Sequence, residues 1–258
     1  MGTVLLLPGY TGSKEDFAPL LDPIAEAGID AVSIDLPGQY ESPGPAVETE
    51  YLPSMLGAVI VDIVEELASG AWPVLLLGHS YGGLVARGAV LGGARVCGLT
   101  LLDSGPAELP PGLRREALDA GSHALKTEGV AAAQRVRQAF DSRMAWWPSA
   151  SEALRALLRE RFLRSSRAGL LGMAEALRHE PDLVATLADR LRSLGAPCNV
   201  VCGVNDDAWP PAVQKDMALR LNGEFAEIPD AAHSPNTQNP EALLATLLPA
   251  WKSWLASS

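Results

Sequence analysis

The sequence is poor in the residues that build disulfide frameworks and metal sites. Three cysteines and four histidines occur among its 258 residues. Cys97, Cys198 and Cys202 stand in apolar surroundings without the close paired spacing of disulfide or zinc sites, and no HExxH motif occurs. Glycine pairs such as Gly92-Gly93 lack the fingerprint of a nucleotide site. We therefore expect reduced core cysteines, no metal and no cofactor.

Basic residues and long apolar runs are also scarce. The chain has 20 Lys and Arg against 31 Asp and Glu, a formal net charge of -11. Binding to nucleic acid or to an anionic membrane needs clustered Lys and Arg, so we expect neither partner. No 18-residue run is free of charges and helix breakers, and the opening MGTVLLLPG lacks the basic n-region of a signal peptide. We expect a soluble cytoplasmic protein.

Six short apolar runs, bounded by Gly, Pro, Asp or Asn, alternate with helical patterns. Continuous apolar runs are typical of strands buried on both faces, and this alternation predicts an α/β fold with a mostly parallel sheet covered on both sides. The expected strands are 3–7, 31–34, 74–77, 99–102, 199–202 and 225–228. The expected helices are 16–27, 51–68, 84–91, 211–221 and 240–255, the last interrupted by Pro249.

Residues 105–195 break this alternation. From Leu113 to Leu194 only helical spacing is present, which predicts four or five helices inserted between two strands. We expect a core of residues 1–104 and 196–258 and a helical lid of residues 105–195. The lid segment holds 14 of the 20 basic and 11 of the 31 acidic side chains, a net charge of +3 against -14 for the remainder. An Arg-rich lid suggests the hypothesis of an acidic substrate.

A G-x-S-x-G motif, Gly78-His79-Ser80-Tyr81-Gly82, follows the apolar run 73–77 and leads into the helical pattern 84–91. A strand before the motif and a helix after it are the context of a nucleophile elbow, a tight turn that exposes one serine hydroxyl above the sheet. The turn needs small residues two positions before and after the serine, which Gly78 and Gly82 provide. Ser80 is therefore the candidate nucleophile.

A serine nucleophile needs a histidine to take its proton and a carboxylate to orient that histidine. His79 adjoins Ser80 inside the turn, where its ring must point elsewhere, and His123 and His179 fall in the helical insertion. His233 lies in a loop that leaves the last expected strand, and loops at the carboxyl ends of parallel strands are where such sheets place their sites. We expect His233 to be the base.

Three aspartates follow expected strands and compete for the role of the acid. Asp206 is preferred because it lies three residues after Gly203 and four before Pro210. Asp207 is the neighbour that we expect to face solvent or to cap the next helix. Asp103, after the strand 99–102, is the fallback. In variants of the Ser-His-Asp arrangement, the strand before the one that leads to Asp206 supplies the carboxylate.

The order Ser80, Asp206, His233 is that of the α/β-hydrolases, and here the sequence resembles that family over most of the chain outside the insertion. The matching segments are LLLPGYTGSKEDF, DLPGQYES, GHSYGG, GVNDDAWP and DAAHSPN. The resemblance implies an oxyanion hole made by the backbone N–H groups of Tyr10 and Tyr81. Where the family commonly has a histidine before the first glycine, this chain has Pro8.

These residues favour a serine hydrolase that forms an acyl-enzyme on a small to medium carboxylic ester. A lactonase, a thioesterase or a carbon–carbon bond hydrolase would use the same three residues, and a ligand-binding protein of the same fold without turnover is the alternative from another class. The acyl group of the substrate needs an apolar pocket, and we expect the side chains of Tyr10 and Tyr81 to line it. The remaining pocket candidates are Met55, Trp146, Trp147 and Trp209.

Overall fold

The apolar runs form one six-stranded sheet in which every neighbouring pair is parallel. The structure is a computed structural model that describes residues 2–70 and 72–258. The strands are β1 (Thr3–Leu7), β2 (Asp30–Ser33), β3 (Val74–His79), β4 (Gly98–Leu102), β5 (Cys198–Gly203) and β6 (Glu224–Ile228). Their order is β2-β1-β3-β4-β5-β6. The predicted α/β class and the sheet of about six strands are confirmed.

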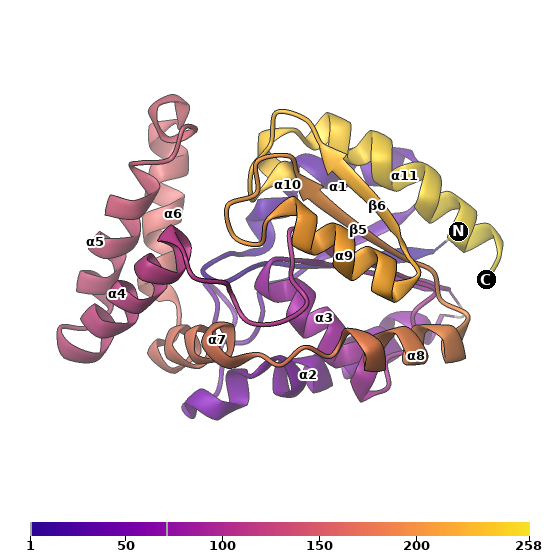
Figure 1. Cartoon of the computed structure of the whole chain (residues 1–258), viewed down its shortest axis with the longest axis horizontal. Coiled ribbons are helices and arrows are strands. Elements are labelled where there is room, and N and C mark those ends of the chain that lie inside the picture. Colours follow the sequence, from indigo (N-terminus) through magenta and orange to yellow (C-terminus); the bar gives the residue numbers. More distant parts are fainter. Residues whose placement is uncertain (1, 71) are drawn as a thin grey trace.

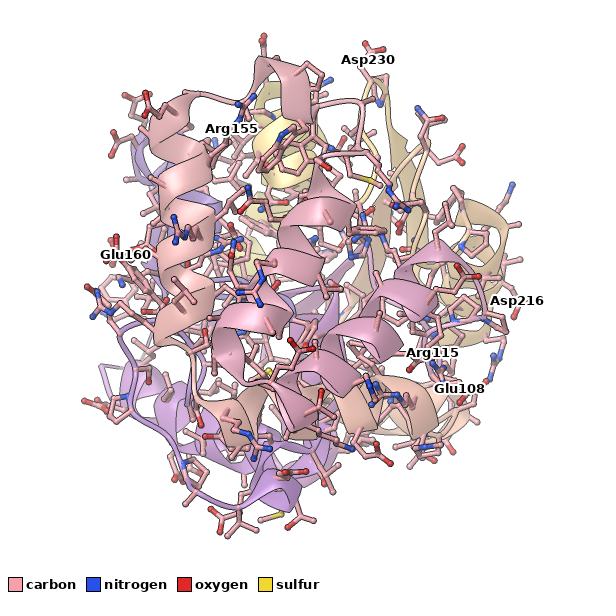
Figure 2. All side chains as sticks on the ribbon, turned by 90° about the vertical axis from the view of Figure 1, so that its left-hand side faces the viewer. Glu108, Arg115, Arg155, Glu160, Asp216 and Asp230 are labelled. Atoms are coloured by element: carbon pink, nitrogen blue, oxygen red, sulfur yellow. The ribbon has the colours of Figure 1, made fainter. Side chains whose placement is uncertain are left out.

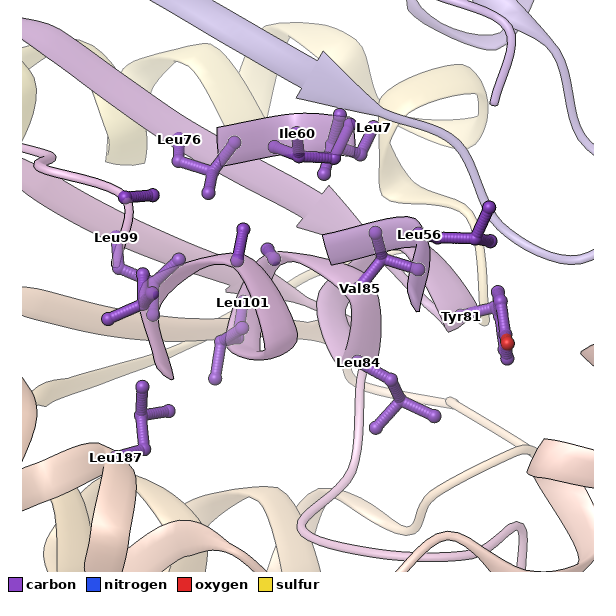
Figure 3. Packing of buried hydrophobic residues seen from close by; sticks show 14 of the residues in the cluster. Leu7, Leu56, Ile60, Leu76, Tyr81, Leu84, Val85, Leu99, Leu101 and Leu187 are labelled. Atoms are coloured by element: carbon purple, nitrogen blue, oxygen red, sulfur yellow. The ribbon is translucent and has the colours of Figure 1, made fainter. Parts of the chain in front are cut away.

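Alternate side chains of the inner strands enter two separate cores. In β1, Leu5 and Leu7 belong to one hydrophobic cluster and Val4 and Leu6 to the other, because successive side chains of a strand point to opposite faces. Figure 3 shows part of the first cluster, in which strand side chains such as Leu76 and Leu101 pack in the same cluster as helix side chains such as Ile60 and Leu187. Both faces are thus covered, and the inner strands β1 and β3 are buried along their whole length and read as mainly apolar runs.

Helices cover both faces of the sheet (Figure 1). One face carries α1 (Ala18–Glu26) and α11 (Pro240–Ala256), which contact each other. The other carries α2 (Pro53–Ala68), α3 (Tyr81–Gly92), α8 (Val184–Leu194) and α9 (Pro211–Leu221), with α2 against α3 and α8 against both α3 and α9. Short helical turns complete the core: η1 (Lys14–Phe17), η2 (Glu48–Tyr51) and α10 (Pro235–Gln238).

The segment between β4 and β5 is helical, as predicted, and contains α4 (Leu113–Thr127), α5 (Val130–Asp141), η3 (Trp147–Ser149), α6 (Glu152–Arg164), α7 (Arg167–His179) and α8. Figure 1 shows α4, α5 and α6 standing to one side of the sheet. In contrast, α7 packs on η2 and α8 packs on α3 and α9. The packing therefore groups α8 with the helices of the core, although its residues lie in the segment 105–195.

Helix α11 runs through Pro249, contrary to the predicted interruption. A proline inside a helix removes one hydrogen bond and costs about 3 kcal/mol. Here Leu243, Leu247 and Trp251 form a stripe at four-residue spacing and are all buried, and burial of each such side chain contributes about 1.5–3 kcal/mol. That burial offsets the cost of the proline. Among the described residues, no helix combines the length and apolar character needed to cross a bilayer.

Candidate active site

Ser80 lies at a sharp turn between β3 and α3. Its φ of 55° and ψ of -120° fall outside the regions that a side chain tolerates well. A Cβ atom at Gly78 would meet the backbone of Gly82, and a Cβ atom at Gly82 would meet the backbone of Leu7. Larger residues would force these backbones apart. The predicted crowding of the turn is present, and it leaves Ser80 at the carboxyl end of β3.

A chain of hydrogen bonds connects the three residues that the sequence analysis selected. His233 Nε2 lies 2.9 Å from Ser80 Oγ, and His233 Nδ1 lies 2.8 Å from Asp206 Oδ1. All three side chains belong to buried residues. Asp206 Oδ1 also accepts a hydrogen bond from the Ala208 N–H, and Asp206 Oδ2 accepts one from Gln214 Nε2. Residues more than a hundred positions apart thus meet in one hydrogen-bonded array.

The surroundings set the charge states of this array. Burial lowers the pKa of His233; Asp206 opposes this shift and Arg114 adds to it, so the pKa ends below its ordinary value. For Asp206, burial by itself raises the pKa, but the His233 ring and the N–H of Ala208 outweigh it and the pKa ends low. At neutral pH the carboxylate is charged and accepts a hydrogen bond from the Nδ1–H group. Nε2 of the neutral ring is then free of a proton and can take the hydroxyl proton of Ser80.

The loop after β1 lies against Ser80. A Cβ atom at Gly9 would lie 3.0 Å from Ser80 Cβ, so the next residue, Tyr10, is held beside the nucleophile. Tyr81 is the first residue of α3, where backbone N–H groups have no acceptor within the helix. These are the two residues whose N–H groups were predicted to form an oxyanion hole, and the structure brings both next to Ser80. Burial raises the pKa of the Tyr10 hydroxyl to about 12, so that side chain is neutral.

A cavity of about 1140 Å³ lies over Ser80 and His233. The inserted helices α4, α5 and α6 supply much of its wall, through apolar side chains together with several arginines. Apolar lining residues include Leu118, Phe140, Trp146, Leu158 and Phe162. The nucleophile and the base therefore open into a large, mainly apolar chamber.

The family model described as "Alpha/beta hydrolase family" matches residues 4–246 of this chain. The chain is an α/β hydrolase. Solved structures with the same fold include a thermophilic esterase from Thermogutta terrifontis, with 24% identity and a TM-score of 0.75, covering 100% of this chain and 90% of that one. An esterase from Exiguobacterium antarcticum has 21% identity and a TM-score of 0.79, covering 98% and 92%. The enol-lactonase from Burkholderia xenovorans has 19% identity and a TM-score of 0.79, covering 97% and 91%.

Some of the predicted pocket residues of this hydrolase line the cavity and others do not. Tyr10, Trp146 and Trp209 line the cavity. Met55 does not line it: this side chain lies on α2 and is 49% exposed, because the buried stripe of α2 is Leu56, Ile60 and Val64. That part of the prediction is wrong.

Two further pocket candidates are also outside the cavity wall. Trp147 packs edge-on against Trp146 and lies under the guanidinium of Arg155, so it supports the wall from behind. The side chain of Tyr81 is buried and its hydroxyl donates to the carbonyl of Tyr51. Tyr81 thus reaches the site through its backbone, not through its ring.

The arginines of the cavity wall are paired with carboxylates. Arg114 on α4 bonds Asp207 at 2.7 Å, and Arg161 on α6 bonds Asp16 at 2.5 Å. In α5, Arg137 bonds Asp141 and also donates to the hydroxyl of Thr11, which follows Tyr10. Figure 2 looks onto these inserted helices and the many charged side chains around them. The hypothesis of an acidic substrate remains a prediction, and it is weakened because each of these arginines already has a carboxylate partner.

The alternative acids occupy different positions. Asp207 is paired with Arg114 and 40% exposed, as expected for a residue facing solvent. Asp103 is buried, and one of its oxygens, one oxygen of Asp206 and a ring nitrogen of His233 all lie within 4.8 Å of one another. Such a group has the composition of a metal site. Both ring nitrogens of His233, however, are engaged by Ser80 and Asp206.

Two buried glutamines support the site and were missed by the sequence analysis. Gln39 donates to the carbonyl of Gly9 and accepts from the N–H of Leu36, which fixes the loop that carries Tyr10. Gln214 bridges Asp206 and the carbonyl of Trp209. Gln39 lies in the segment DLPGQYES, which resembles the family, but an amide side chain does not by itself indicate a role in the site. The partners of both glutamines are distant along the chain or lie across a turn.

Proposed function

We propose that this α/β hydrolase cleaves small to medium carboxylic esters through an acyl-enzyme. Ser80 attacks the carbonyl carbon while His233 takes the hydroxyl proton and then delivers it to the leaving alcohol. Asp206 holds the ring in the required tautomer and stabilises the imidazolium. The N–H groups of Tyr10 and Tyr81 bind the developing oxyanion. Water, activated by His233, then releases the acid.

One observation carries this proposal: the unbroken path from Ser80 Oγ through the His233 ring to the Asp206 carboxylate, with distances of 2.9 and 2.8 Å. These are the distances required for proton transfer from a nucleophile to its base. The lowered pKa of His233 keeps its ring unprotonated at neutral pH, which is the form that a base needs.

The cavity supports an ester with a substantial apolar part. Its volume of about 1140 Å³ slightly exceeds the range of ordinary ligand sites, about 300–1,000 Å³. Leu118, Phe140 and Phe162 offer apolar surface to an acyl chain. We propose that α4, α5 and α6 act as a lid over this chamber, since their side chains line the cavity and the three helices stand to one side of the sheet.

A lactone is the second candidate. It is a cyclic ester and passes through the same tetrahedral and acyl-enzyme stages, so the site needs no additional residue. An enol-lactonase has the same fold, which favours lactones over thioesters as the next class to test.

The test is a panel of p-nitrophenyl esters of increasing acyl length, with simple lactones assayed beside them. We expect turnover of the esters, with the highest kcat/KM at a medium chain length, and loss of turnover by a factor of about 10⁴ or more in Ser80→Ala. Equal rates in the wild type and Ser80→Ala on every compound would contradict the proposal. Turnover of lactones alone would move the assignment to the second candidate.

A further inference from the structure

A second carboxyl group lies beside the acid of the proposed site. Asp103 is the residue directly after β4, and it is completely buried. Its backbone N–H donates to the carbonyl of Val201, and its φ of 46° lies in the left-handed region. The structure holds this side chain in place at a conformational cost, because a residue other than glycine rarely adopts such a φ.

The two carboxyl groups have very different sets of partners. Asp206 accepts hydrogen bonds from the Ala208 N–H, the Gln214 amide and the His233 ring. Asp103 Oδ1 accepts one, from the N–H of Gly203 at 2.9 Å. Asp103 Oδ2 is buried and has no donor among the described residues. The environment is therefore built to hold a negative charge on Asp206, but not on Asp103.

We propose that Asp103 is a neutral carboxylic acid whose Oδ2–H donates a hydrogen bond to the Asp206 carboxylate. A proton on Oδ2 gives that buried oxygen the partner that it lacks. The Asp103 and Asp206 carboxyl groups are neighbours, close enough for a side-chain hydrogen bond between them. Asp103 is then a positioning residue: it fixes Asp206, which in turn fixes the ring of His233. This inference rests on the proposed hydrolytic role of Ser80, His233 and Asp206.

The charged groups around Asp103 favour its neutral form. Burial and the negative charge of Asp206 raise the pKa of Asp103 well above its ordinary value, and the Gly203 N–H and Arg114 oppose the shift only in part. The Cys202 thiol, whose pKa is also raised, adds no charge. Two carboxylates sharing a buried site do not ionise together, and the neutral His233 ring donates its hydrogen bond to Asp206, not to Asp103.

Two substitutions separate a neutral hydrogen-bond donor from a buried charge. Asp103→Asn retains the shape, an oxygen for the Gly203 N–H and an N–H donor toward Asp206, and asparagine tolerates the left-handed backbone. Asp103→Gly removes the side chain without backbone strain. We expect kcat of the Asn variant to fall by less than about tenfold and that of the Gly variant to fall by about 10²-fold, because a small displacement of the catalytic groups is costly.

An infrared measurement at pH 7 tests the proton directly. The difference spectrum between the wild type and Asp103→Asn should contain the C=O stretch of a protonated carboxylic acid. Asp35→Asn is the matched control, because Asp35 also follows a strand but pairs with Lys14. Its difference spectrum should lack the acid band.

The inference is overturned if the acid band is absent from the Asp103→Asn difference spectrum. It is also overturned if the Asn variant is as slow as the Gly variant, or if the Gly variant turns over at the wild-type rate. Failure of the proposed function has a different signature: the wild type itself would then hydrolyse esters no faster than Ser80→Ala. The infrared result is obtained with the folded protein and does not depend on substrate.

Discussion

Gly78 and Gly92 stand on either side of Ser80, and a methyl group at each position meets different surroundings. At Gly78 an added Cβ would collide with the Gly82 backbone, whereas at Gly92 it would lie 3.6 Å from the side chain of Val61, an ordinary contact. Gly78→Ala should therefore destabilise the fold by about 1–3 kcal/mol. Gly92→Ala, the matched control at the last residue of α3, should leave the stability unchanged or raise it by at most about 0.5–1 kcal/mol. Urea unfolding measures both, and an equal effect at the two positions would contradict the crowded turn.

His79 gives the fold a dependence on acid that can be measured separately from activity. Its Nε2–H donates to the His233 carbonyl at 2.6 Å, and burial lowers its pKa to about 4. The unfolded chain, with a pKa near 6.5, binds more protons than the native state between these values. The free energy of unfolding therefore falls as pH drops from about 6.5 to 4.

Replacing His79 should remove this part of the pH dependence. Between pH 7 and pH 4.5 the free energy of unfolding of His79→Gln should fall by about 2 kcal/mol less than that of the wild type, given the shift to about 4. Urea titrations at the two pH values measure the difference. Parallel losses in the two proteins would show that His79 does not resist protonation in the native state.

Single residues also show where sequence analysis succeeds. Ser80, His233 and Asp206 could be selected because each has a side chain suited to the reaction and each follows a predicted strand. The carboxyl ends of the strands of a parallel sheet lie at the same edge. Gln39 and Gln214 could not, because an amide carries no signature of its role until its partners are known. Met55 was misplaced for a related reason: α2 is apolar on most of its surface, so its sequence does not show which stripe faces the core.

At the scale of elements, α4 acts on the site through one charge. Arg114 lies near His233 and lowers its pKa, in addition to the larger effect of burial. The base must be unprotonated to act, so kcat/KM falls as pH drops through this pKa. Removing the positive charge makes protonation easier, and Arg114→Leu should shift the acid limb of the pH profile to higher pH.

The neighbouring arginine provides the control. Arg115, labelled in Figure 2, is on the same helix and pairs with Asp119. Arg115→Gln should leave the acid limb where it is in the wild type. An acid limb that stays in place in Arg114→Leu, or moves to lower pH, would refute the electrostatic link between α4 and the base.

The ends of most strands and helices could be predicted from the local sequence pattern. The exceptions are ends that depend on packing against distant parts of the chain. The strands were placed to within two residues, because buried strands read as apolar runs bounded by breakers. Helix α3 begins at Tyr81 instead of residue 84 because the elbow starts the helix directly after the serine. Helix α11 continues past Pro249 because its buried stripe outweighs the lost hydrogen bond. Neither effect is visible in a short window of sequence.

At the scale of the whole molecule, the positive inserted segment faces a strongly negative remainder. Arg114 and Arg161 connect these parts through Asp207 and Asp16, so part of the imbalance in the sequence is an attraction between the inserted helices and the core. The cavity wall consequently holds paired charges. The sequence predicted a helical lid, but not these ion pairs, because each joins residues that are far apart along the chain.

Neutral and anionic esters of the same size test this distribution of charge. We expect no preference for the anionic ester, and a ratio of kcat/KM values that does not change between low and high salt, because paired cations offer little net attraction. A strong anion preference that weakens as salt is added would contradict the paired arrangement and restore the hypothesis of an acidic substrate.

The most direct test of the whole account is covalent labelling of Ser80 by a fluorophosphonate, followed by mass spectrometry of the intact protein and of its peptides. We expect one label, on the peptide containing Ser80, no label in Ser80→Ala, and much slower labelling in His233→Ala, because the hydroxyl needs its base. A folded wild type that stays unlabelled, or is labelled at another residue, would contradict the claim that Ser80, His233 and Asp206 form a working nucleophilic site.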